Sequence, residues 1–251
     1  MRLAGFRAIT ATLLFPLATL FAAEQPSAEQ VLDKFVEVTG GRAAYESIKT
    51  EITTGTLEIS AMGLTGNLTS YKAAPDKSYT VVEFAGVGKA EEGSNGEVAW
   101  SINGMEGPRI KQGEERALAM RNNAMHSEVR WRDYFKKVEL AGAEDVDGKP
   151  CYKIVMTPGE GKPETRYYAK SSNLLVRVTL SADTPNGPAD VELDLSDYRD
   201  EGGLMTPHTI SQKLPNAEIL VKLAGIKRNE EIPSERFDLP AEIKGALAQK
   251  K

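Results

Sequence analysis

The sequence predicts a mainly β (α+β) fold of about ten antiparallel strands, and three observations support this. From Thr50 onward, apolar and polar residues alternate with a period of two, which is typical of strands with one buried face. Short turn signals separate these segments; Asp147-Gly148, for example, favours a hairpin. Helical patterns are confined to the start and the middle of the chain. Successive antiparallel pairs favour one strongly curved sheet, although a two-sheet sandwich would show much the same pattern.

The first 23 residues have the layout of a secretory signal peptide. Arg2 and Arg7 precede an apolar run from Ala8 to Phe21, and small residues follow this run before Glu24. An uncleaved membrane anchor is the alternative, but the apolar run is shorter than the roughly 20 residues that a membrane span needs. We therefore expect a signal peptide over residues 1–23 and a single secreted domain over residues 24–251.

The charge and the cysteine content narrow the classes of function. The 31 basic residues are outnumbered by 36 acidic ones and form no basic run, so we expect no nucleic-acid partner. The same balance argues against attraction of the protein surface to anionic lipid head groups. Cys151 is the single cysteine, which excludes an internal disulfide. A chain of this length can instead be stabilised by a hydrophobic core.

The first element of the mature chain is predicted to be a helix that begins after Ser27 and ends before Gly40. Ser27 and Gln30 have the spacing of a capping box, and the Gly-Gly pair that follows is typical of a helix end. The apolar residues of this helix share one face, so it must lie against an apolar surface. A short second helix is expected over residues 42–48.

The first group of strands is expected around residues 50–61, 66–73, 77–85 and 96–102. The glycine-rich segment 86–96 lacks the spacing of a phosphate-binding loop and is interpreted as a flexible loop. The segment from Glu114 to Phe135 contains neither Gly nor Pro, and it is predicted to be helical throughout.

The second half of the sequence returns to strands. A hairpin is expected around Asp147-Gly148 and another over residues 165–180, and the alternation returns around residues 191–195 and 219–223. The last residues, 240–251, are expected to form a frayed, solvated end.

The sequence contains no motif that indicates an enzyme or a metal site. His126, His208 and Ser127 could be combined with an aspartate into a triad, but no Gly-x-Ser-x-Gly motif supports it. Asp194, Asp197, Asp200 and Glu201 resemble an acidic cluster, yet Glu192 and Asp194 fall on the polar face of a predicted strand, where solvated charge is usual. We therefore expect no enzymatic activity, no metal and no cofactor.

The apolar residues of the middle helix point to a ligand space. Leu118, Met120 and Met125 stand out, because methionine fills irregular spaces and suits surfaces that accept varied apolar partners. A helix across the concave face of a curved antiparallel sheet can enclose an apolar pocket. The alternative is that these side chains simply pack on the sheet, and the residues alone leave both interpretations open.

Several of these features occur together in one known family. The signal peptide, the capped helix ending in "EVTGGRAAYESIKT" and the segment "NGEVAWSINGMEGPRIKQGEE" before a helix occur in that order. The hairpin "VDGKPCYKIVM" and the late segment "DLSDYRDEGGLMTPHTI" follow. In this order and spacing, over roughly residues 27–240, the chain resembles the outer-membrane lipoprotein-sorting protein family with the LolA-like fold.

The resemblance implies an incomplete antiparallel β-barrel of about ten or eleven strands with a helical lid. It implies a periplasmic protein that holds an acyl chain, a lipid or a lipoprotein in an apolar cavity without covalent chemistry. The cavity would then be lined by Phe35, Leu57, Ile59, Trp100, Met120, Met125, Ile154, Val178 and Leu193. The same fold serves envelope-stress sensors, so the alternative is a filled barrel that binds a partner protein, such as an envelope membrane protein.

Overall fold

The computed structural model describes residues 25–184 and 187–249. The predicted signal peptide, residues 1–23, lies outside the described residues. Within them, the helices are α1 (Ala28–Val38), α2 (Arg42–Ser47), α3 (Gly113–Asn123), α4 (Trp131–Tyr134) and α5 (Ala241–Ala248), with two 3₁₀ turns, η1 (Ser60–Met62) and η2 (Ser234–Phe237). None of the helices in this part of the chain is long and apolar enough to cross a membrane.

The described strands form one antiparallel sheet of thirteen strands. The first group is β1 (Thr50–Ile59), β2 (Leu64–Ala73), β3 (Lys77–Phe84), β4 (Gly88–Asn95), β5 (Ala99–Asn103) and β6 (Gly107–Ile110). The second group is β7 (Phe135–Val146), β8 (Lys149–Pro158), β9 (Glu164–Ala169), β10 (Leu175–Thr184), β11 (Gly187–Glu201), β12 (Leu204–Leu214) and β13 (Ala217–Arg228).

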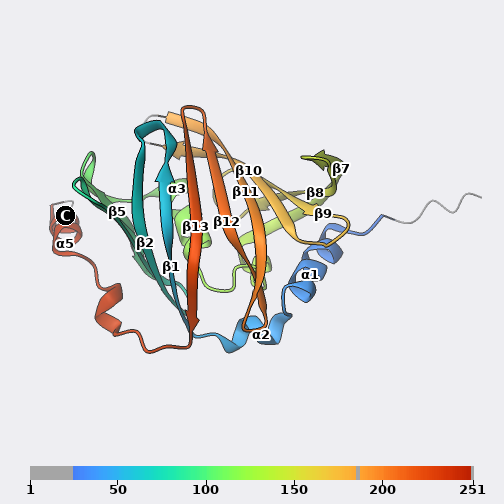
Figure 1. Ribbon diagram of the computed structural model, residues 1–251, viewed down its shortest axis with the longest axis horizontal. Coiled ribbons are helices and arrows are strands. Elements are labelled where there is room, and N and C mark those ends of the chain that lie inside the picture. The colour runs from blue at the N-terminus through green and yellow to red at the C-terminus, as the bar shows by residue number, and fades with distance from the viewer. Residues whose placement is uncertain (1–24, 185–186, 250–251) are drawn as a thin grey trace, which may run out of the picture.

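The sheet is open, with β6 and β7 as its two edges. The strand order runs from β6 down to β1, then from β13 down to β7, so the pairing of β1 with β13 joins the two groups at the centre. Figure 1 shows the curvature of this sheet, with α1 below the β7–β9 end and α5 beside the β5 end. The predicted incomplete antiparallel barrel is confirmed, with thirteen strands instead of ten or eleven.

The N-terminal helix closes a core against one end of the sheet. Its predicted capping box is present: the Gln30 backbone N–H donates to Ser27 Oγ at 3.2 Å, and the Ser27 N–H donates to Gln30 Oε1 at 2.8 Å. Leu32 and Phe35 of α1 pack with Ile154 of β8 and with Trp131, all of them buried. This core anchors α1 on the inner, concave side of the sheet.

The helix α3 connects the two arms of the sheet across its concave side. It touches β4 and β5 in one arm and β10 in the other. Ser94 Oγ on β4 lies 3.2 Å from Met120 Sδ, while the next residue, Arg121, pairs with Glu164 on β9. Consecutive residues of one helix therefore hold opposite arms of the open sheet.

The prediction of unbroken helix from Glu114 to Phe135 is wrong, because residues 124–130 form a loop between α3 and α4. The Met125 N–H donates to the carbonyl oxygen of Pro75 at 3.1 Å, and His126 adopts a left-handed conformation (φ 61°). His126 Nε2 also lies 2.8 Å from the Ile48 carbonyl oxygen. These tertiary contacts end the helix although no Gly or Pro marks the position; we call residues 124–130 the lid loop.

Two further predictions from the sequence are wrong. The glycine-rich segment interpreted as a loop contains β4, which pairs with β3 and β5. Gly93 is required there, because a Cβ atom at this position would lie 2.9 Å from Cζ2 of the Trp100 ring. Most of the end that was expected to fray is ordered: α5 packs near β6, and Ile243 is fully buried, while residues 250–251 lie outside the described residues.

The contact between α1 and the sheet can be tested at Ile154. Its side chain is fully buried against α1, so Ile154→Ala would leave a cavity. We expect a loss of about 2–5 kcal/mol in the free energy of unfolding, measured by urea denaturation. Val87→Ala is the control: Val87 is 66% exposed, and this change should alter stability by less than about 0.5 kcal/mol. Equal effects of the two changes would contradict the packing described here.

Candidate ligand-binding pocket

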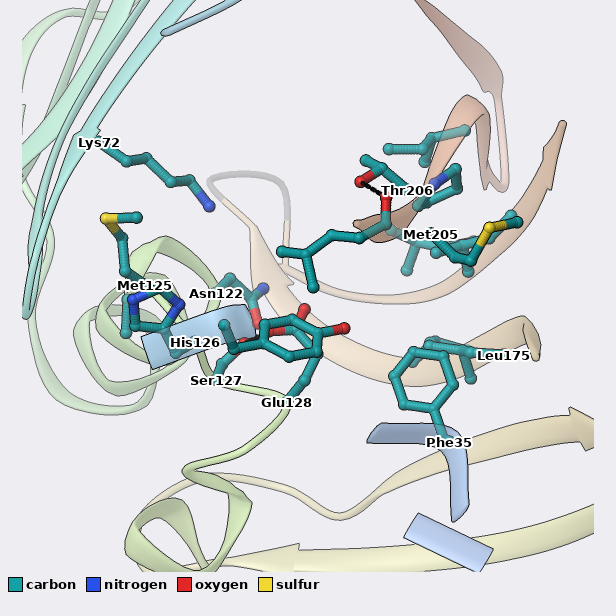
Figure 2. Close-up of a pocket in the computed structure, with 18 of the residues that line it drawn as sticks. Phe35, Lys72, Asn122, Met125, His126, Ser127, Glu128, Leu175, Met205 and Thr206 are labelled. Atoms are coloured by element: carbon teal, nitrogen blue, oxygen red, sulfur yellow. Dashed lines mark hydrogen bonds between the residues drawn. The ribbon is translucent and has the colours of Figure 1, made fainter. Parts of the chain in front are cut away.

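A pocket of about 400 Å³ lies between the inner face of the sheet and the lid loop (Figure 2). This volume falls within the range of about 300–1,000 Å³ that is typical of small-molecule sites. Its apolar wall includes Phe35, Val178, Leu180, Leu193, Leu195 and Ile210. These residues come from α1 and from the three neighbouring strands β10, β11 and β12.

The alternation of each strand explains why the apolar residues gather on one wall. Val178 lies opposite Leu193, and Leu195 lies opposite Ile210. Directly opposed residues of antiparallel strands point to the same face, and their apolar side chains repeat every second residue. The result is a continuous apolar surface across three strands, and these side chains are only partly covered by the rest of the protein.

The lid loop closes the pocket on the side opposite the sheet. Met125 and Val129 are buried in a small cluster with Tyr45 and Ile48 of the α2 region. The ring of His126 packs edge-on against Tyr45, with 6.4 Å between the ring centroids. The lid loop is therefore attached to the α2 region, while its Ser127 and Glu128 line the pocket.

A buried ionic cluster lies at the end of the pocket nearest α3. Glu164 Oε2 accepts a hydrogen bond from Arg121 at 3.1 Å, and Glu164 Oε1 accepts one from Arg166 at 2.7 Å. Both guanidinium groups lie near the ring of Phe135, at 5.1 and 5.3 Å from its centroid. Burial alone would lower the pKa of Arg166, but the charge of Glu164 raises it above the ordinary value. Arg166 therefore stays cationic.

A second ion pair lies at another side of the pocket. Arg228 of β13 donates from Nε to Glu51 Oε2 at 2.9 Å, and it also donates to Thr206 Oγ1 at 3.0 Å and to the Glu201 carbonyl oxygen. Both charges of this pair are mostly covered. The pair is thus internally satisfied within the pocket wall.

The two histidines are used in structural contacts. His126 Nε2 is within hydrogen-bond distance of a backbone carbonyl, as described above. His208 is buried, with Nε2 2.9 Å from Glu201 Oε1 and Nδ1 3.0 Å from the Thr206 carbonyl oxygen. Among the hydrogen bonds of the described residues, neither imidazole bonds to Ser127, whose hydroxyl lies 3.5 Å from Glu128 Oε2.

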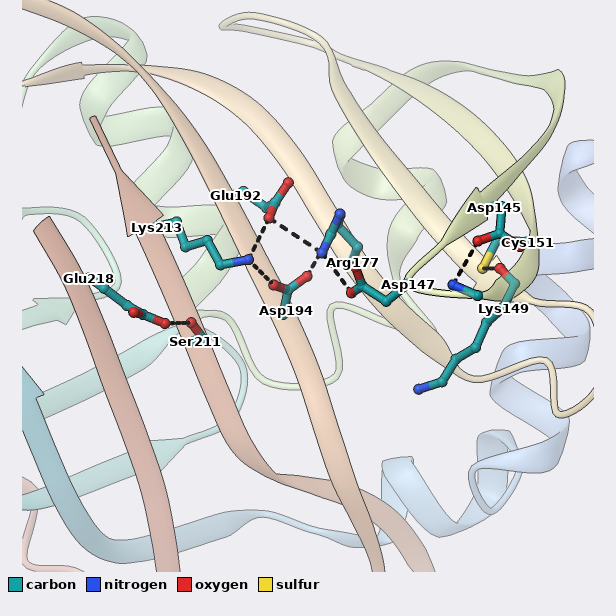
Figure 3. A network of polar contacts seen from close by, with 11 residues as sticks. Asp145, Asp147, Lys149, Cys151, Arg177, Glu192, Asp194, Ser211, Lys213 and Glu218 are labelled. Atoms are coloured by element: carbon teal, nitrogen blue, oxygen red, sulfur yellow. Dashed lines mark hydrogen bonds and ion pairs between the residues drawn. The ribbon is translucent and has the colours of Figure 1, made fainter. Parts of the chain in front are cut away.

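The acidic residues of β11 form ion pairs on the outer face of the sheet (Figure 3). Asp194 is held by Arg177 and Lys213, and Glu192 contacts both of the same cations. Burial raises the pKa of Asp194, but the hydrogen bonds from Arg177 and Lys213 outweigh it and hold that pKa below its ordinary value. Among residues 25–184 and 187–249, no group of three or more His, Cys, Asp or Glu side chains could hold a metal ion.

The pocket contains four of the nine residues that the sequence analysis proposed as cavity lining. They are Phe35, Met125, Val178 and Leu193. Two more, Leu57 and Ile59, lie outside the pocket but on the same face of the sheet. Ile59 pairs with Ile219, Ile219 pairs with Gln212, and Gln212 pairs with Leu193. Because directly opposed residues share a face, Ile59 lies on the same face as Leu193.

The other three proposed residues lie elsewhere. Ile154 is on the inner face, but α1 covers it completely. Met120 contacts Ser94 on α3's side of the sheet. Trp100 packs with Tyr79, with 6.1 Å between the ring centroids, on the face of the sheet opposite α3.

Sequence reasoning did not identify the charged residues of the pocket. Lys72 and Glu51 are not expected in a pocket from the sequence, because charged residues within strands usually belong to the solvated face. A signal was nevertheless present: Lys72 is four residues after Leu68 in β2, so both side chains belong to the same face, and Leu68 is buried. The lid loop residues Ser127 and Glu128 carried no such signal.

The sequence matches no family model, and no curated protein matches it. Three solved structures share its architecture over almost their whole length. A LolA superfamily protein from Nitrosomonas europaea has a TM-score of 0.58 at 12% identity, covering 86% of this chain and 99% of that one. A DUF1329 family protein from Desulfovibrio piger has a TM-score of 0.57 at 17% identity, covering 84% and 97%.

The third structure is a domain from Vibrio parahaemolyticus described as an outer membrane lipoprotein-sorting protein. It has a TM-score of 0.54 at 13% identity, covering 86% of this chain and 99% of that one. These matches show that the chain has the LolA-like fold, which confirms the architecture implied by the resemblance in the sequence.

The buried ionic cluster gives a prediction for Glu164. Glu164→Gln would leave Arg121 and Arg166 without a carboxylate in a site where the three side chains are at most 16% exposed. We expect a loss of about 3–5 kcal/mol in unfolding free energy, since uncompensated buried charge is costly. The control is Glu144→Gln, which breaks an exposed pair with Lys153 and should cost less than about 1 kcal/mol. Similar losses in both variants, measured by chemical denaturation, would be inconsistent with this role of Glu164.

Proposed function

We propose that this chain is a periplasmic binding or carrier protein for a lipid or an acylated ligand, including a lipoprotein. The ligand's acyl chain would lie in the pocket between the lid loop and the inner face of β10–β12, and no covalent chemistry would take place. The observation that carries the proposal is the pocket itself: about 400 Å³ of space against a continuous apolar wall.

The energetics of acyl binding fit such a pocket. Each buried methylene contributes about 0.8 kcal/mol, so ten of them supply about 8 kcal/mol. That free energy corresponds to a dissociation constant in the micromolar range before the cost of ordering the ligand is subtracted. Affinity at this level suits a carrier, which must both take up and release its cargo.

Two further points support the proposal, one from other proteins and one from this chain. The fold is shared with a protein described as an outer membrane lipoprotein-sorting domain and with a LolA superfamily protein. The N-terminal signal expected from the sequence would export the chain to the compartment where such cargo is found. Delivery of cargo would involve an envelope membrane protein or the membrane itself.

The pocket assignment can be tested by filling it. Val178→Trp would place an indole ring among Leu193, Leu195 and Phe35, so we expect uptake of a fluorescent fatty acid to fall at least tenfold. Thr179→Trp is the matched control, because Thr179 is the next residue of β10 and belongs to the opposite face. It should bind as the original protein does.

Both variants should be compared by fluorescence titration after their folding has been verified by circular dichroism. Normal binding by a folded Val178→Trp variant would contradict the pocket assignment. If the unmodified protein takes up no fatty acid at all, the alternative of a partner-binding module is favoured instead.

A further inference from the structure

Among the described residues, the pocket contains one cation without a partner. Three cationic side chains line the pocket in the described part of the chain: Lys72, Arg166 and Arg228. Arg166 is paired with Glu164, and Arg228 is paired with Glu51. Among the contacts of the described residues, Lys72 makes no ion pair and its ammonium group makes no hydrogen bond, although it is half-buried.

The neighbouring residues explain why Lys72 has no partner within residues 25–184 and 187–249. Glu51 lies directly opposite Lys72 across β1 and β2, at a spacing where opposite charges usually pair. Glu51 instead accepts from Arg228, which is held in place by Thr206 and by the Glu201 carbonyl oxygen. The carboxylate directly opposite Lys72 is therefore bound to another cation.

The position of Lys72 is suited to a ligand. Figure 2 shows its extended side chain with the ammonium group directed into the pocket. On its other side, across β2 and β3, it lies opposite Ser78, whose buried hydroxyl has no hydrogen-bond partner in the part of the chain that the structure describes. An unpaired charge beside an apolar wall is unfavourable, and an anion would offset that cost.

We propose that the ligand carries an anionic head, a carboxylate or a phosphate, that pairs with the ammonium group of Lys72. Its acyl chain then lies along the wall that includes Phe35, Val178 and Leu193. This inference rests on the proposed function and narrows it to anionic acyl ligands. It does not require a basic surface, because a single cation inside the pocket supplies the recognition.

The other charges facing the pocket define where the head lies. Glu51 and Glu164 are neutralised by their arginines, whereas Glu128 of the lid loop has no ion-pair partner among the described residues. An anion is therefore repelled from the lid loop and attracted to the β2 side. His126 makes its hydrogen bond to the Ile48 carbonyl oxygen and is not required for the head.

The test compares three ligands with the same twelve-carbon chain: laurate, dodecyl phosphate and dodecanol. Binding is measured by isothermal titration calorimetry below the micellar range, with the unmodified protein and three variants. Lys72→Met removes the cation, Lys72→Arg keeps it, and Lys77→Met removes an equal charge from an exposed position of β3. Thermal unfolding shows whether each variant is folded.

We expect Lys72→Met to weaken binding of the preferred anion by about ten- to hundredfold, the range of a hydrogen bond to a charged group. Dodecanol should bind both proteins within about threefold of each other. Lys72→Arg should retain most of the affinity and Lys77→Met all of it. Preference for laurate identifies a fatty acid head, and preference for dodecyl phosphate identifies a phospholipid-like head.

The two proposals fail in different ways. If laurate, dodecyl phosphate and dodecanol bind equally and Lys72→Met changes none of them, the anionic head is refuted while the apolar pocket stands. If none of the three binds the unmodified protein, the proposed function itself is refuted. Should Lys72→Met fail to fold, the head is tested by comparing the three ligands on the unmodified protein and on Lys72→Arg.

Discussion

An open sheet of thirteen described strands must be held in its curved shape by contacts other than backbone hydrogen bonds, because its two edge strands, β6 and β7, do not pair with each other. The helix α3 supplies these contacts. Met120 reaches Ser94 on β4, and Arg121 reaches Glu164 on β9, so the two arms are tied through adjacent residues. The ionic contact is buried and directional, which makes it costly to leave half-formed. The distance between the arms, and hence the space beneath the sheet, depends on this bridge.

The position of the pocket depends on where the helix α3 ends. After Asn123 the chain leaves the helix and forms the lid loop, whose backbone and imidazole bond to the β2–β3 turn and to the end of α2. Toward one end of the sheet, α1 packs on the inner face and buries Ile154. Between these two covered regions, the apolar side chains of β10–β12 remain partly uncovered. A ligand with an apolar chain would complete the burial that the protein's own residues leave unfinished.

Local rules predicted much of the fold and less of the pocket. The capping box of α1 and the one-sided strands were readable because they depend on neighbouring residues. The alternation of β5 shows which residues share a face with Trp100, but it does not show which face of the sheet is concave, because that depends on the whole sheet. In the structure, Trp100 lies on the face opposite α3. Ile154 is on the inner face, but it is covered by α1. This contact joins segments that are distant in sequence, so the strand pattern does not reveal it. The lid loop is likewise set by contacts with Pro75 and Ile48, distant in sequence from His126.

The most direct test of a ligand space is to ask what the protein carries when it is made in a cell. Residues 24–251 would be exported to a bacterial periplasm, purified without detergent and extracted with organic solvent. Released lipids would be identified by mass spectrometry beside a control secreted protein. We expect a near-stoichiometric acyl species that is absent from the control. An extract no different from the control, together with no uptake of a fluorescent fatty acid, would contradict a ligand-binding pocket.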